Sequence, residues 1–162
     1  MPFTPFHFGP SSCGALLLRK YIDFPVFVLA NVIVDVEPLL VMVFNFNYPL
    51  HGYCHTLFFG SLFGILVTPF FYLVRGGLKK AMTYLRLPYE TNYRKVMISV
   101  ILGIWLHVLL DAFLYPDIRP FFPLADNPLY GKLGYSKVYA MCAIFFVPAF
   151  ILYRRIRLKT ED

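Results

Sequence analysis

Residues 104–115 read IWLHVLLDAFLY, an apolar run interrupted by one histidine, His107, and one carboxylate, Asp111. On a helix, side chains four residues apart lie on one face, about one turn from each other. An imidazole and a carboxylate at this spacing can bind one metal ion or form an acid–base pair. The apolar run from Val96 to Tyr115 predicts a helix at membrane depth, where ionisable side chains are costly and usually functional.

The whole chain is unusually apolar and aromatic. Of its 162 residues, 59% are hydrophobic, including 18 Phe and 12 Tyr, and the mean hydropathy is +0.63. This composition predicts one integral membrane domain over residues 1–162. It argues against the alternative for His107 and Asp111, which is a polar pair satisfied inside a soluble helix. The three cysteines lack paired spacing, so we expect neither a disulfide nor a cysteine metal site.

The apolar segments predict an all-α, polytopic membrane helix bundle with four spanning helices and a short N-terminal helix. The short helix follows a breaker at residues 9–12. Residues 75–95 form a polar linker, and Pro116 ends the third span. No basic segment with a cleavage site opens the chain, so we expect the first apolar segments to remain in the mature protein. The predicted spans are residues 24–44, 57–74, 96–115 and 138–153.

The net charge of +6 comes from Lys and Arg residues that gather at the ends of the apolar segments. All but three of the 15 lie at positions 19–20, 75–95 or 154–159. They are not interleaved with aromatic residues in a polar domain, so we expect no nucleic acid partner. The positive-inside tendency places the three clusters in the cytoplasm, in a multi-pass protein of the inner or plasma membrane.

With this orientation, all four histidines of the chain fall in the outer half of the bundle. Measured from the nearest basic residue of a cytoplasmic cluster, a helical rise of about 1.5 Å per residue puts His7, Asp35, His107 and Asp111 about 18–24 Å into the membrane. The histidines at 51 and 55 reach the same layer from outside. We expect the metal ligands to come from this layer, and the candidates are His7, Asp35, Glu37, His51, His55, His107 and Asp111.

Imidazole nitrogen with carboxylate oxygen favours Zn²⁺, with Mn²⁺ or Fe²⁺ as alternatives. Carboxylates near mid-membrane cost roughly 3 kcal/mol each, and one or two divalent ions would compensate them. Asp35 and Glu37 lie about 200° apart on a regular helix, so both can face the site only if the helix is distorted near Pro38. Arg119, beyond the third span, is a candidate for binding a phosphate oxygen of a substrate, with interfacial snorkelling as the alternative.

Four short motifs follow one another along the chain: an early histidine at 7, Asp-x-Glu-Pro at 35–38, Gly-x-x-His-Thr-Leu at 52–57 and His-x3-Asp at 107–111. Their order and spacing resemble the YdjM-type family of LexA-binding, inner-membrane-associated hydrolases. Two positions depart from the family pattern: His51 stands where arginine is typical, and Glu37 stands where a second aspartate is usual.

This resemblance implies a metal-dependent hydrolase, more distantly similar to the all-α zinc phospholipases C and nucleases. The substrate would be a phosphoester, for example a membrane phospholipid, attacked by a metal-activated water. Asp35 and Glu37 would be the catalytic residues, with Glu37 as a general base or bridging ligand. The alternative is a non-catalytic membrane protein that carries metal or binds a partner. A carrier needs ligands along a path through the membrane, whereas an enzyme needs them in one layer with an open coordination position.

The predicted topology can be tested with single cysteines at positions 80 and 126 in a cysteine-free background. We expect a membrane-impermeant thiol reagent to label position 126 in intact cells and position 80 only after permeabilisation, because the 75–95 cluster is cytoplasmic. Labelling of both positions from the same side would contradict the topology.

Overall fold

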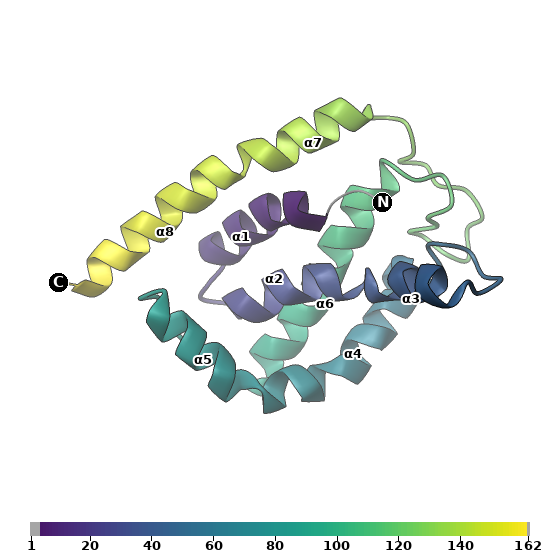
Figure 1. Cartoon of the computed structure of the whole chain (residues 1–162). Helices are drawn as coiled ribbons and strands as arrows, with labels where there is room; N and C mark the ends of the chain where they lie inside the picture. The colour runs from purple at the N-terminus through teal and green to yellow at the C-terminus, as the bar shows by residue number, and fades with distance from the viewer. Residues whose placement is uncertain (1–3, 162) are drawn as a thin grey trace.

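The computed structural model describes residues 4–161, and every regular element in that range is a helix (Figure 1). Three segments are long and apolar enough to cross a membrane: Phe24–Phe44, Tyr93–Ala112 and Tyr135–Lys159. The elements are η1 (Thr4–His7), α1 (Phe8–Leu17), α2 (Phe24–Ile33), α3 (Val36–Phe44), η2 (Tyr53–His55), α4 (Leu57–Leu73), α5 (Arg75–Tyr84), α6 (Tyr93–Ala112), α7 (Tyr135–Ile144) and α8 (Phe146–Glu161).

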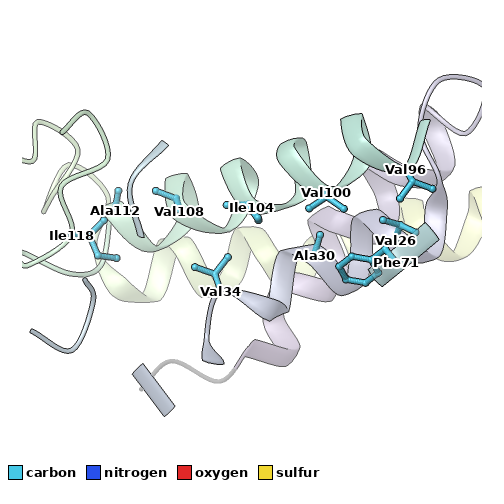
Figure 2. Close-up of a cluster of buried hydrophobic side chains, with 10 residues drawn as sticks. All are labelled: Val26, Ala30, Val34, Phe71, Val96, Val100, Ile104, Val108, Ala112 and Ile118. Carbon is cyan, nitrogen blue, oxygen red and sulfur yellow. The ribbon is translucent and has the colours of Figure 1, made fainter. Parts of the chain in front are cut away.

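The helix α6 is the centre of the fold and packs against both α2 and α4. Side chains at four-residue spacing form one buried stripe on α6 and another along α2, and the two stripes face each other in Figure 2. This spacing repeats on one helix face, so two such stripes can interdigitate along their length. The stripes are Val96, Val100, Ile104, Val108 and Ala112 on α6, and Val26, Ala30 and Val34 along α2.

A neighbouring row on α6 makes polar contacts with α2. The backbone N–H of Asp23 donates to Ser99 Oγ at 2.6 Å, and Asn31 Nδ2 donates to the carbonyl of Gly103 at 3.0 Å. At Gly103 the helices are so close that a Cβ atom would lie 2.6 Å from the carbonyl oxygen of Phe27. The residue at this position must therefore be glycine for α2 and α6 to meet.

The first spanning segment is interrupted between α2 and α3, at Val34 and Asp35. Asp35 is the N-cap residue of α3, and Pro38 is the third residue of that helix, where a missing N–H breaks no intrahelical hydrogen bond. The predicted distortion near Pro38 is therefore present. It lets Asp35 and Glu37 both turn toward the bundle, which a regular helix would not allow.

The structure corrects the predicted linker at 75–95, because its first half is the helix α5. Its Met82 is buried, and Leu78, one turn earlier, packs on the central core, so the segment is amphipathic despite its charge. The helices α4 and α5 are bent by 68° relative to each other, and they make a fourth candidate span only if the pair is counted as one.

Two predicted helix boundaries also shift. The N-terminal helix begins at Phe8, before the predicted breaker, because Pro10 lies in its first turn, where proline is tolerated. The central helix begins at Tyr93 and ends at Ala112, three residues earlier than predicted at each end, and Asn92 caps its N-terminus by accepting a hydrogen bond from Lys95 N–H.

The three basic clusters come together at one end of the molecule. There the last residues of α1, α5 and α8 lie on the same side of the molecule (Figure 1). With the loop before α6 they share a small apolar cluster, beside Arg19 and Lys95. The loops that follow α3 and α6 lie at the other end. The apolar cluster consists of Leu16, Met82, Leu87 and Ile156.

We expect Gly103→Ala to lower the free energy of unfolding by about 1–3 kcal/mol, because backbone atoms that cannot move aside would meet the new methyl group. Gly76→Ala in α5 is the matched control, since nothing lies within 4 Å of its Cβ position. The control should be neutral or stabilising by about 0.5–1 kcal/mol. Equal effects of the two substitutions on unfolding in mixed micelles would contradict the close packing.

Candidate metal centre

Four side chains from three parts of the chain converge beside the C-terminal half of α6. His107 and Asp111 lie one turn apart on α6, Asp35 comes from the break between α2 and α3, and His55 is the last residue of η2. Each offers one ligand atom, and these atoms all lie within 4.8 Å of one another. Within residues 4–161 this is the one group of three or more such side chains placed so that it could hold a metal ion.

The distances around His107 fit shared coordination better than hydrogen bonding. His107 Nε2 lies 3.3 Å from Asp35 Oδ1 and 3.4 Å from Asp111 Oδ2. Ligand atoms bound to one ion at about 2.0–2.1 Å with tetrahedral angles lie about 3.3–3.4 Å apart. These contacts therefore have the spacing of two edges of a coordination tetrahedron.

Several of the converging atoms are buried without a hydrogen-bond partner. Within the described part of the chain, His55 Nε2, His107 Nε2 and Asp111 Oδ1 make no hydrogen bond. Such atoms normally find a partner, because an unsatisfied buried polar group costs about 1–3 kcal/mol and a charged one costs more. A cation bound between them would satisfy them, so the donor set fits a divalent metal.

Glu37 fixes the ring of His55 from the far side. Its Oε2 lies 2.9 Å from His55 Nδ1 and accepts the backbone N–H of Gly52 at 3.1 Å. Its Oε1 accepts the backbone N–H of Cys54 at 3.2 Å. A carboxylate on the outer nitrogen selects the tautomer whose Nε2 is free to bind metal. Glu37, predicted to be a metal ligand or a general base, contacts the outer nitrogen of a candidate ligand.

His7 stands behind His107 and Asp111. Its Nδ1 forms a hydrogen bond with His107 Nδ1 at 3.2 Å. Its Nε2 lies 3.2 Å from Asp111 Oδ1, without hydrogen-bond alignment. If His107 binds metal through Nε2, its Nδ1–H donates to His7 Nδ1, and the proton of His7 is then on Nε2, facing the carboxylate. His7 is buried and supports two candidate ligands, but it lies outside the group of four.

Burial shifts the pKa values of two neighbouring residues in the loop before α4. Burial lowers the pKa of His55, which favours the neutral imidazole that binds metal. Burial raises the pKa of the neighbouring Cys54 thiol to about 11, so this cysteine stays protonated near neutral pH and does not supply a thiolate ligand.

His51 lies outside the group of four and pairs with an aspartate that sequence analysis did not single out. Its Nδ1 lies 2.9 Å from Asp117 Oδ2, which also accepts the backbone N–H of His51 at 3.3 Å. The ring of His51 packs on that of His55, with centroids 4.8 Å apart. The two partners are 66 residues apart in sequence, so no local spacing could reveal the pair. Arg119 lies two residues beyond Asp117 and is exposed.

Comparison of the chain with protein-family models, curated proteins and solved structures finds no match.

We expect the four converging residues and the two supporting residues to differ in their effect on bound metal. His107→Ala and Asp111→Ala should each abolish tight binding, because each removes one of four ligands. Glu37→Gln and His7→Ala should weaken affinity about 10–100-fold, since they disturb only the orientation of a ligand. Competition with a chromogenic chelator measures both effects, and Cys54→Ser is the control that should keep full affinity. Loss of metal in Cys54→Ser, or none in His107→Ala, would contradict the site.

Proposed function

We propose that the protein is a membrane-embedded, metal-dependent hydrolase that acts on a phosphoester. The observation that carries this proposal is the convergence of two imidazoles and two carboxylates, with buried ligand atoms that lack hydrogen bonds, in one layer of a helical membrane protein. The proposal agrees with the four motifs that resemble the YdjM-type family, and we propose membership of that family on the motifs alone.

The placement in the membrane is part of the proposal. The gathering of all three basic clusters at one end supports a cytoplasmic location for that end, in the inner or plasma membrane. We propose four spans, with α4 and α5 as the second, in which α5 bends into the cytoplasmic interface. The metal centre, at the opposite end of α6, then lies in the outer half of the bilayer.

One zinc ion is the occupant that the ligand set favours, with manganese or iron as alternatives. Asp35 and Asp111 would balance the two charges of one ion, so the four-ligand group needs no second ion. When bound, the metal would have to take a water as a fifth ligand beside the four residues, and it would then lower the pKa of that water toward neutrality and polarise a phosphoryl oxygen.

The protein's own residues would hold and orient this centre. His107 and Asp111 are fixed by the central helix, while Glu37 and His7 select the tautomers of the two histidine ligands. Asp35 keeps 23% of its side chain exposed, against 1% or less for the other three, so the cluster is not sealed from outside. A membrane phospholipid or another phosphoester at the outer leaflet would be the substrate.

The alternative of a metal carrier is less well supported. A carrier needs successive sites along a path across the membrane. Among residues 4–161 the structure has one group that could hold a metal, beside the C-terminal half of α6. A single layer of ligands supports chemistry at a fixed site over transport.

We expect the zinc-loaded protein to release headgroup or phosphate from a phosphoester in liposomes, chelation to abolish the rate, and added zinc to restore it. Asp35→Asn should lose metal and activity together. Glu37→Gln should regain activity to within about tenfold of wild type at saturating zinc if Glu37 only orients His55, whereas a general base would leave the rate about 100-fold or more lower. Asp126→Asn, an exposed loop substitution, is the control.

The opposite outcome would support the carrier. If metal-loaded protein turns over no phosphoester in a broad panel and moves metal across sealed vesicles, the hydrolase proposal is wrong.

A further inference from the structure

A cavity of about 430 Å³ opens between the loop that follows α3 and the loop that follows α6. Sites for small molecules usually measure about 300–1,000 Å³, so this volume is sufficient for a phospholipid headgroup. The lining residues that matter here are Tyr48, His51, Tyr53, Asp117, Arg119 and Phe122.

The cavity is lined by one negative and one positive side chain that are not fully paired with other residues the structure describes. Asp117 gives only Oδ2 to His51, and its Oδ1 accepts no hydrogen bond from any residue the structure describes. Its side chain is 38% exposed. Arg119 is exposed and forms no ion pair within residues 4–161. A ligand with a cationic group for Asp117 and an anionic group for Arg119 would use both charges at once.

Aromatic rings surround the two charges. Tyr48, Tyr53 and Phe122 line the cavity, and the rings of Tyr53 and Phe122 meet edge to face at 5.7 Å. Aromatic faces attract organic cations, so these walls suit an ammonium group better than a second anion. Tyr48 is held in place by its hydroxyl, which accepts the backbone N–H of Tyr53 at 3.1 Å.

The cavity adjoins the metal centre. His51 lines the cavity, and its ring contacts the ring of His55 edge to face, with centroids 4.8 Å apart. Thr56, the residue after His55, lines the same cavity. The cavity therefore borders on a candidate metal ligand.

We propose that this cavity is the substrate-binding site and that it selects phosphoesters whose headgroup carries a cationic amine, with the amine at Asp117 and the aromatic walls and the phosphate at Arg119. The proposal rests on the proposed hydrolase function for its biological meaning. Binding itself follows from the charges and walls of the cavity, and it can be measured without turnover.

The test compares two soluble headgroups, glycerophosphoethanolamine and glycerol 3-phosphate, by calorimetric titration of the detergent-solubilised protein. We expect the first to bind at least tenfold more tightly. Asp117→Asn should remove this preference by weakening glycerophosphoethanolamine about tenfold, because it deletes the charge while its amide oxygen still accepts from His51. Arg119→Gln should weaken both ligands about tenfold, and Arg154→Gln, at the other end of the molecule, should weaken neither.

Equal affinity for the two headgroups, or an unchanged preference in Asp117→Asn, would overturn the proposal. So would binding that Arg119→Gln leaves intact. Bound metal and thermal unfolding of each variant show that it is folded. A headgroup that binds with the expected preference but is never cleaved supports the cavity proposal and counts against the hydrolase.

Discussion

The close contact between α2 and α6 is the constraint on which the rest of the structure depends. Gly103 lets the two backbones approach, and polar contacts then continue along both helices at four-residue intervals on α6. The last of these contacts brings a carboxylate from the end of α2 to the imidazole of the central helix. The metal centre is therefore positioned by the packing of two spans. The contacts join Ser99 to Asp23, Gly103 to Asn31 and His107 to Asp35.

Burial makes the charge of Asp111 costly unless a cation is bound beside it. The side chain of Asp111 is 1% exposed, and an isolated carboxylate in such surroundings is costly. Bound metal would offset this cost and would also stabilise the folded state, because the four ligands converge only when the helices are packed. The orienting contacts of Glu37 and His7 then limit each histidine to one tautomer. Stability and metal affinity are thus linked through the same residues.

The sequence was most informative where chemistry depends on local spacing. His107 and Asp111 could be paired because four residues make one helical turn, and the distortion at Pro38 followed from the positions of Asp35 and Glu37. Sequence could not separate ligands from supporting residues, because histidine and glutamate serve both purposes and the difference lies in which ring nitrogen faces the site.

Long-range and amphipathic features were harder to predict. The contact between His51 and Asp117 joins two loops with no periodic pattern, and the three basic residues of α5 concealed its apolar face. The most direct test of the account is X-ray absorption spectroscopy of the zinc-loaded protein. The account predicts only nitrogen and oxygen ligands at about 2.0–2.2 Å, with imidazole scattering from two histidines. Sulfur scattering at about 2.3 Å, or no imidazole signal, would contradict it.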